Sequence, residues 1–266
     1  MYEFTYESLT EAQVQAYLDR IGFCGPHTCS KENLDQLVYL HQCHIVFENL
    51  DVFYKQLPLA LDAEGLFDKI ITRGRGGFCF ELNGLFVLLL RALGYDAYSC
   101  VCRVAANRTE LGNLAHRAVI VTLDGKTYIC DVGLGGPMPP FAVEISETHQ
   151  TQRGETTWVE PTEMGWYLQR RLTKEGAEAN IIIFGMQAFL AKDFIPLCTA
   201  LTDDPNSVFR TNLMVNLRRP DGYHRLRNGV LTLESAEGKE ERTITDAELP
   251  AVLKEYFFLP ELDFLP

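Results

Sequence analysis

The chain has 266 residues, of which 24 are lysine or arginine and 36 are aspartate or glutamate, so its formal net charge at pH 7 is −12. Apolar residues make up 47% and charged residues 23%, which is typical of a globular protein and argues against a disordered chain. The negative balance argues against binding to nucleic acid or to an acidic lipid surface, since either needs clustered positive charge.

Neither a membrane span nor a leader is predicted. No apolar stretch approaches the ~20 residues that a membrane helix requires. The opening residues, MYEFTYESLTEAQ, lack the basic and apolar segments of a signal peptide. We therefore expect a cytoplasmic protein with no nucleic-acid and no membrane partner, whose eight cysteines are free thiols.

The N-terminal third predicts helices. Apolar residues recur every three or four positions in SLTEAQVQAYLDRIGF (8–23), which Gly22 ends. The same spacing recurs in KENLDQLVYLHQCH (31–44), for which Ser30 is the expected N-cap. A third, strongly apolar helix begins at Phe78 and ends before Gly94.

After Gly94 the pattern changes to strands. HRAVIVTL (116–123) and KTYICDVGL (126–134) are joined by Asp124-Gly125, a pair typical of tight hairpin turns. The other strand segments are YSCVCRV (98–104), TWVEP (157–161), WYLQRRL (166–172), FRTNLMVNLRR (209–219) and YHRLRNGVLTLE (223–234). The charged run EGKEER (237–242) predicts a solvated loop, and a capping box starting at Thr245 predicts a final helix. Helices, then strands, then a closing helix indicate an α+β protein.

The segment RGRGGFCFELN (73–83) contains the first candidate for chemistry. Cys79 stands at the first turn of the apolar helix, where unpaired N–H groups favour a thiolate over a thiol. The surrounding glycines let a ligand approach the backbone, and Arg73 and Arg75 would add positive potential. From this segment alone, a buried and unreactive cysteine is an equally good interpretation.

The predicted hairpin supplies two partners for a thiol. A two-residue turn at Asp124-Gly125 fixes the register, so that His116 faces Gly133 and lies diagonal to Asp131 on one side of the ribbon. Taken singly, each of these residues is more often structural. Together with Cys79 they form the order thiol, imidazole, carboxylate, which predicts a thiolate–imidazolium pair and acyl transfer through a thioester.

The sequence resembles the arylamine N-acetyltransferase family. The resemblance rests on the segments around His116 and Asp131 and on IVFENLD (45–51), RGRGGFCFELN (73–83), GLGG (133–136) and PNSVFRTN (205–212). It implies an N-terminal helical bundle, a central β-barrel-like domain and a C-terminal α/β lid, around a Cys-His-Asp core like that of cysteine proteases and transglutaminases. We place these three domains at residues 1–94, 95–195 and 196–266.

The resemblance also implies an activity. Acetyl-CoA would be the donor, and the acceptors would be arylamines, arylhydroxylamines or arylhydrazines. By position, Cys79 would be the acetylated nucleophile, His116 the base and Asp131 the carboxylate that orients it. No metal is expected: Cys24, Cys29, His41 and His44 do not have zinc-finger spacing.

Further residues match the family's binding positions. The coenzyme would lie beside Gly133, Gly135, Gly136 and Ser207. Backbone N–H groups of a glycine loop bind anions without basic side chains, which suits a net-acidic protein. The acceptor pocket would be lined by Phe47, Val104, Leu134 and Phe209.

Two positions depart from the family pattern. Val46 stands where proline is usual, and Leu134 stands where phenylalanine is usual. The second change removes an aromatic ring from the mouth of the expected acceptor pocket, which leaves the preferred arylamine open.

Other functions remain open. The same three residues would serve an amide synthase that closes a macrolactam in natural-product assembly, or a thiol hydrolase in which water replaces the amine. A ligand-binding protein that kept the fold is the alternative outside enzymes. The oligomeric state is not determined by the sequence.

Overall fold

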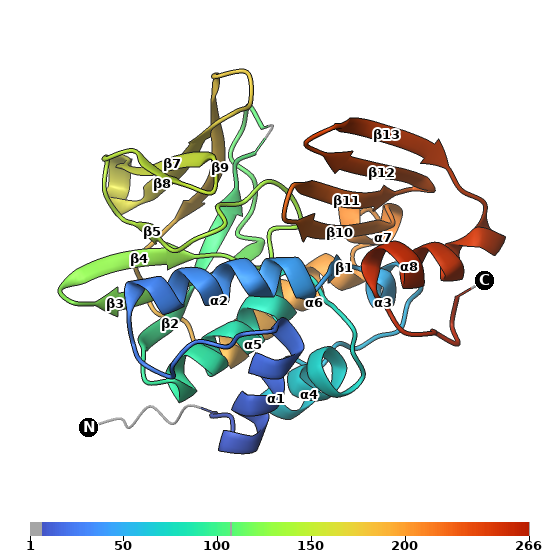
Figure 1. The fold of residues 1–266 in the computed structure, drawn as a ribbon, viewed down its shortest axis with the longest axis horizontal. Helices are drawn as coiled ribbons and strands as arrows, with labels where there is room; N and C mark the ends of the chain where they lie inside the picture. Colours follow the sequence, from blue (N-terminus) through green and yellow to red (C-terminus); the bar gives the residue numbers. More distant parts are fainter. Residues whose placement is uncertain (1–6, 107, 266) are drawn as a thin grey trace.

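The computed structural model, which describes residues 7–106 and 108–265, has three groups of elements. Figure 1 shows the N-terminal helices below a strongly curved sheet, and a second sheet with helix α8 beside them. The α+β class, the helical N-terminal part and the barrel-like middle predicted from the sequence are confirmed.

Local hydrogen bonds fix the ends of the first two helices, and the sequence predicted two of these ends, at Gly22 and at Ser30. The hydroxyl of Thr10 accepts from the backbone N–H of Gln13, and Gly22 ends α1 at a φ of 69°. Ser30 caps α2 through the N–H of Asn33. The helical elements of this part are α1 (Glu11–Ile21), α2 (Lys31–His44), α3 (Leu50–Phe53), α4 (Ala63–Phe67), the π-helical η1 (Asp68–Thr72) and α5 (Cys79–Ala92).

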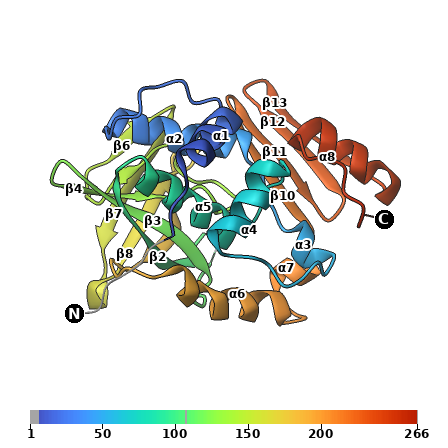
Figure 2. The same ribbon diagram turned by 90° about the horizontal axis from the view of Figure 1, so that it is seen from below.

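Helix α5 occupies the centre of the molecule. Every residue from Cys79 to Leu90 is buried, because β2 and β3 pack on one side of the helix and α1 and α4 on others (Figure 2). Each fully buried leucine contributes about 1.5–3 kcal/mol to folding, so this helix is a main source of stability. In the described part of the chain, no helix has the length and apolar character needed to span a membrane.

The first sheet curves until its two ends meet. Its strand order is β5-β4-β3-β2-β9-β8-β7-β6 among the described residues, with antiparallel neighbours. The N–H of Val159 in β7 donates to the carbonyl of Ser146, just after β5, at 3.0 Å, which nearly closes a barrel. The strands are β2 (Asp96–Val104), β3 (His116–Leu123), β4 (Lys126–Cys130), β5 (Val143–Glu144), β6 (Gln150–Gln152), β7 (Glu155–Pro161), β8 (Tyr167–Leu172) and β9 (Glu178–Phe184).

The second sheet joins the two ends of the chain. Its order is β1-β10-β11-β12-β13, and Phe47 of β1 pairs with Asn216 of β10. This sheet therefore combines a strand of the first predicted domain, β1, with a strand of the third, β10. The domain boundaries at 94 and 195 stay a prediction. The strands are β1 (Phe47–Glu48), β10 (Met214–Arg219), β11 (Gly222–Arg227), β12 (Val230–Ser235) and β13 (Gly238–Thr243). The remaining helices are η2 (Glu163–Gly165), η3 (Ala191–Asp193), α6 (Phe194–Asp203), α7 (Val208–Thr211), η4 (Asp246–Glu248) and α8 (Leu249–Phe257).

Three predictions about secondary structure were wrong, one in the type of element and two in where a strand begins or ends. The run 237–242 is mostly edge strand β13 rather than a loop, because β12 supplies its backbone partners while its charged side chains stay in water. The segment 209–219 begins as helix α7, because Ser207 caps a first turn there. Strand β4 ends at Cys130 rather than Leu134, because the Asp131 carboxylate accepts from the N–H of Gly133.

Five charged side chains lie buried together beneath the loop that leads into α5. The ammonium of Lys69 is 2.6 Å from Asp51 Oδ2 and 2.7 Å from Glu81 Oε1. The Arg75 guanidinium is 2.7 Å from Glu48 Oε1 and 2.7 Å from Asp51 Oδ1. The segments before, within and after the loop are thereby tied to one another.

This cluster also fixes the first turn of α5. The second carboxylate oxygen of Glu81 accepts from the N–H of Phe78 at 3.0 Å, directly before Cys79. Burial raises the pKa of Glu81, and the nearby Lys69 ammonium partly offsets that effect. The ammonium is therefore needed to keep the carboxylate charged at the start of the helix.

Removing the ammonium should destabilise the protein strongly. Lys69→Met leaves the buried Glu81 and Asp51 carboxylates without their shared cation, so we expect a loss of about 3–5 kcal/mol in the free energy of unfolding. Urea unfolding of the wild type and the variant measures it. Lys174→Met, which removes an exposed lysine paired with Glu234, is the control and should change stability little. A Lys69→Met protein as stable as this control would contradict the cluster's structural role.

Candidate active site

The thiol of Cys79 lies at the first position of α5 and is only 3% exposed. Its sulfur is 3.8 Å from the carbonyl oxygen of Ala115, and it lies close enough to His116 to raise the pKa of that imidazole. A side chain at Gly133 would place a Cβ 2.9 Å from the Cys79 Cα, which is closer than real contacts allow. The loop after β4 therefore approaches the thiol closely because it has glycine there.

His116 begins β3 and connects the thiol to a carboxylate. Its Nε2 is 2.6 Å from Asp131 Oδ2, which leaves Nδ1 for Cys79. Burial alone would lower the pKa of the imidazole, but the charge and hydrogen bond of Asp131, helped by Cys79, raise it to about 10. The imidazolium is consequently the stable form of His116 at neutral pH.

Asp131 lies just after β4 and is buried, and both of its carboxylate oxygens have hydrogen-bond partners. While Oδ2 faces His116, Oδ1 accepts from Asn83 Nδ2 and from the N–H of Gly133, each at 2.9 Å. A carboxylate held by several donors keeps a fixed orientation. The imidazole is thereby fixed with one nitrogen toward the thiol.

Asn83 was not predicted as a site residue, yet it holds the site together. Its amide nitrogen donates to the Arg117 carbonyl at 2.6 Å as well as to Asp131, and its oxygen accepts from the N–H of Val132 at 3.0 Å. The signal available in the sequence was its position four residues after Cys79. That spacing places both side chains on one face of the helix.

Gln42 of α2 supports the same region from the other side and was also missed. Its amide nitrogen donates to the carbonyl oxygens of Asp131 and Pro139, both at 2.9 Å. Its oxygen accepts from Arg218 Nε at 2.7 Å. All three partners are distant in sequence, so no local pattern could reveal the role of this glutamine.

The predicted hairpin register is correct, but one contact inferred from it is wrong. Leu123 pairs with Lys126 and Val119 with Cys130, as a two-residue turn at Asp124-Gly125 requires. The ladder ends at Cys130, so Gly133 does not face His116 across the ribbon. Gly133 instead packs against α5 beside Cys79.

The expectation that Arg73 and Arg75 add positive potential at the thiol is also wrong. Arg75 is neutralised within the buried cluster by Glu48 and Asp51. Arg73 is largely exposed and pairs with Asp68 at 2.8 Å. Cys79 interacts electrostatically with His116 and with Arg117 instead.

The expected coenzyme residues have different surroundings. Gly136 has open space where a side chain would be, whereas a Cβ at Gly135 would lie 2.6 Å from the ring of Phe47. Gly135 also has a φ of 70°, which favours glycine. The hydroxyl of Ser207 accepts from the N–H of Phe209, and so caps α7.

Of the expected acceptor residues, the two phenylalanines approach the loop that carries Cys79. Phe47 bridges to Gly77 in the backbone, and the ring of Phe209 packs edge-on against Phe78 at a centroid distance of 5.4 Å. Val104 ends β2, and Leu134 packs against the barrel core. Their roles in binding stay a prediction.

The arrangement is that of an activated nucleophile: a thiol, a base beside it, and a carboxylate that orients the base. Such a group attacks carbonyl carbon and forms a covalent acyl intermediate. Within residues 7–106 and 108–265, no group of three or more His, Cys, Asp or Glu side chains could hold a metal ion.

Several known proteins are similar to this chain in sequence or in fold. A profile of the N-acetyltransferase family matches residues 31–262. The arylamine N-acetyltransferase of Escherichia coli (strain K12) is 31% identical over 265 residues, covering 91% of this chain and 87% of that protein. The solved structure of the Mycobacterium marinum arylamine N-acetyltransferase in complex with CoA gives a TM-score of 0.85 at 26% identity, covering 92% of each chain. Proansamycin X synthase of Amycolatopsis mediterranei (strain S699) is 35% identical over 161 residues, which cover 59% of this chain and 62% of that protein.

Protonation of His116 should stabilise the fold in a defined pH window. The folded pKa of about 10 lies above the ordinary 6.5, so the stabilisation is fully present below pH 6.5 and is lost as the pH rises to about 10. In a Cys79→Ser background, which removes the thiol next to the imidazole while Asp131 still holds it, the free energy of unfolding should fall by roughly 1 kcal/mol per pH unit as the pH rises above 6.5. Urea unfolding at a series of pH values measures this slope.

The matched control is Cys79→Ser combined with His116→Gln, which lacks the titrating imidazole. Its free energy of unfolding should depend less steeply on pH over the same range. Parallel curves for the two proteins would contradict a raised pKa at His116.

Proposed function

The chain belongs to the arylamine N-acetyltransferase family, and on that premise we propose that it transfers acetyl from acetyl-CoA to an aromatic amine in two steps through acetylated Cys79. The observation that carries this proposal is the buried His116–Asp131 pair beside the thiol. The structure of the M. marinum relative in complex with CoA supports CoA as the carrier. The proposed acceptors are arylamines, arylhydroxylamines and arylhydrazines.

In the first step the Cys79 thiolate attacks the thioester carbonyl of acetyl-CoA. A carbon–sulfur bond forms to Cys79, the bond to the CoA sulfur breaks, and CoA leaves with the proton that His116 donates. Acetyl-Cys79 and a neutral His116 remain. Asp131 keeps the imidazole oriented through Nε2 while Nδ1 exchanges the proton.

In the second step the amine attacks the carbonyl carbon of acetyl-Cys79. The nitrogen–carbon bond forms, His116 accepts a proton from the amine, and the carbon–sulfur bond breaks. The products are the N-acetylated amine and the thiolate–imidazolium pair that began the cycle. Backbone N–H groups at the very start of α5, before Glu81, are the proposed stabilisers of the oxyanion, since the N–H of Glu81 already donates to the Phe78 carbonyl at 3.0 Å.

The binding residues are proposed from their surroundings. The glycine loop suits the coenzyme because Gly136 is open and Gly133 admits no side chain beside Cys79. The aromatic rings of Phe47 and Phe209 lie at the loop before Cys79, where an aryl ring would need to enter. Leu134 offers a flexible aliphatic side chain, so we propose that ring stacking depends on Phe47.

An amide synthase is the second candidate, and the similarity to proansamycin X synthase favours it. The same chemistry would apply: an acyl group on Cys79 and attack by an amine, with the amine tethered to the acyl chain. A matched pair of acyl donors separates the two functions. Acylation by acetyl-CoA supports the acetyltransferase, whereas acylation only by long carrier-bound chains supports the synthase.

Intact-protein mass spectrometry tests the proposal. After mixing with acetyl-CoA and no amine, we expect a mass increase of one acetyl group, mapped to Cys79, because deacylation lacks its acceptor. Adding aniline should then remove the acetyl group and yield acetanilide.

The control is Cys79→Ala, which keeps the fold and should gain no acetyl group. If acetylated wild-type protein loses its acetyl group without amine at a higher rate than it forms acetanilide with aniline, the protein is a hydrolase. Absence of any adduct on folded wild type would contradict acetyl transfer through Cys79.

Asn83 should act as a positioning residue. Asn83→Leu removes a donor to Asp131 and frees the Val132 N–H, so we expect kcat/KM to fall about 10–100-fold. The pH of half-maximal activity should shift at the same time, because Asp131 then holds His116 less firmly. Steady-state kinetics with acetyl-CoA and aniline measure both.

Asn33→Leu is the matched control for this variant. Asn33 is also a buried asparagine, but its amide nitrogen donates to the carbonyl oxygens of Pro26 and Thr28, just before α2. Its loss should lower stability and leave the pH profile unchanged. Equal pH profiles for Asn83→Leu and the wild type would reduce Asn83 to a structural role.

A further inference from the structure

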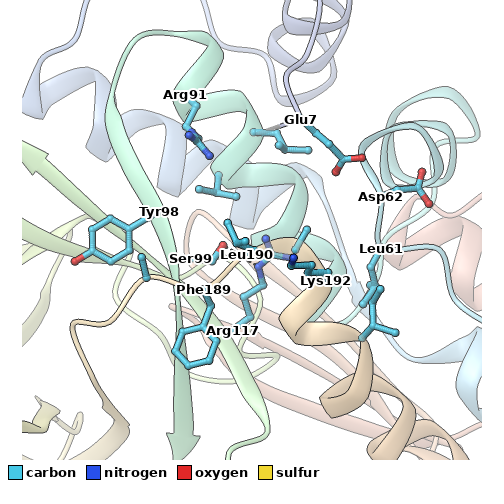
Figure 3. Close-up of a pocket in the computed structure, with 15 residues that line it drawn as sticks. Glu7, Leu61, Asp62, Arg91, Tyr98, Ser99, Arg117, Phe189, Leu190 and Lys192 are labelled. Carbon is cyan, nitrogen blue, oxygen red and sulfur yellow. Dashed lines mark hydrogen bonds between the residues drawn. The ribbon is translucent and has the colours of Figure 1, made fainter. Parts of the chain in front are cut away.

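A pocket lies against the C-terminal half of α5, away from the Cys79 thiol. It has a volume of about 340 Å³, within the range of small-molecule sites. Helix α5, strands β2 and β3 and the segment 188–195 form most of its wall, and none of Cys79, His116 or Asp131 lines it. Figure 3 shows side chains from these elements pointing into a common space.

The polar feature of this pocket is the guanidinium of Arg117, the residue after His116. Its side chain reaches from β3 toward the middle of the pocket (Figure 3). Its Nε donates to the Ser99 hydroxyl at 3.0 Å, Nη1 donates to the Phe80 carbonyl at 3.2 Å, and the group lies 4.4 Å from the ring centroid of Phe194. Arg117 is 3% exposed.

The positive charge of Arg117 has no counter-charge beside it. Over the described ranges 7–106 and 108–265, no carboxylate lies within ion-pair distance of Arg117, and its two side-chain hydrogen bonds go to the neutral Ser99 hydroxyl and Phe80 carbonyl. Burial lowers the pKa of Arg117 to about 10, only partly offset by more distant groups. A buried cation without an anion is costly, and an anion in the pocket would relieve that cost.

The acidic residues at the edge of the pocket are engaged elsewhere. The carboxylate of Glu7 accepts from the N–H of Ala63, and that of Asp62 accepts from the N–H of Gly65, both at the start of α4. The basic side chains of Arg91 and Lys192 line the pocket together with Arg117. The pocket therefore has basic side chains at several points of its lining, in a chain whose net charge is −12.

Most of the remaining wall, as far as the described residues form it, is apolar. It consists of aliphatic and aromatic side chains: Leu61, Val87, Leu88, Phe189, Leu190 and Ile195. Water alone satisfies such a surface poorly, and an inorganic anion would leave it unfilled. An apolar wall next to a buried cation fits a single molecule with an apolar body and an anionic end.

We propose that this pocket binds a small organic monocarboxylate with an apolar body, its carboxylate on Arg117 and its body among the side chains of α5 and segment 188–195. A carboxylate matches the planar fork of a guanidinium, and the Ser99 hydroxyl supplies a second donor beside it. The pocket is separate from the thiol, because none of Cys79, His116 and Asp131 lines it, although the Arg117 carbonyl accepts from Asn83 of the active site.

Fluorine NMR with para-trifluoromethylbenzoate tests the proposal. We expect saturable binding by the wild type, and binding at least about tenfold weaker for the neutral para-trifluoromethylbenzamide, which has the same body without the charge. Equal binding of the two probes would overturn the proposal. So would absence of carboxylate binding up to about 10 mM, which is weaker than a ligand site requires.

Two variants locate the binding. Ala191 lines the pocket, so Ala191→Trp should fill it and abolish binding of the benzoate. Ala200→Trp, the same substitution on the exposed side of α6, should bind as the wild type does. If Ala191→Trp binds as tightly as Ala200→Trp, the benzoate lies elsewhere and the proposal fails.

Arg117→Lys tests the recognition of the carboxylate. Lysine keeps the positive charge but lacks the two parallel N–H donors of the guanidinium, so the benzoate should bind about tenfold more weakly. Unchanged affinity would contradict recognition by Arg117. Because Arg117 also supports the backbone of Phe80, circular dichroism must first show that this variant folds; if it does not, Ala191→Trp decides the question.

Discussion

The buried carboxylate of Asp131 is the constraint on which the site depends. It accepts from an imidazole on β3, an amide on α5 and a backbone N–H of its own loop, and its carbonyl accepts from Gln42 on α2. A buried charge is stable only when donors surround it, so these elements must meet at this point. The same contacts join the helical part to the barrel-like sheet and orient the imidazole toward the thiol.

Helix α5 serves this site and the buried charge cluster with opposite faces. Cys79 and Asn83, four residues apart, face the loop after β4, while Glu81 between them faces Lys69. The start of the helix is thereby fixed from both sides, by the charge cluster and by the Asp131 region. Such rigidity suits a nucleophile whose attack requires a defined distance and angle.

Local features of this fold were predictable from the sequence, whereas long-range ones were not. The end of α1 at Gly22, the cap at Ser30 and the hairpin register at Asp124-Gly125 depend on neighbouring residues, and they are confirmed. The family resemblance, confirmed by the comparisons, supplied the barrel. Gln42 could not be found, because its partners lie far along the chain. Arg75 was misjudged for the same reason: Glu48 and Asp51 reach it only through the fold.

A protonated His116 held between Asp131 and the Cys79 thiol is the feature that most needs a direct measurement. Nitrogen NMR of protein labelled in its histidine rings gives the protonation state, with His116→Gln to assign the signal. At about pH 8, where an ordinary histidine is neutral, we expect both ring nitrogens of His116 to carry protons and to titrate near 10. A signal with one unprotonated nitrogen and a pKa near 6.5 would show that Asp131 does not hold the imidazolium, and would contradict the proposed mechanism.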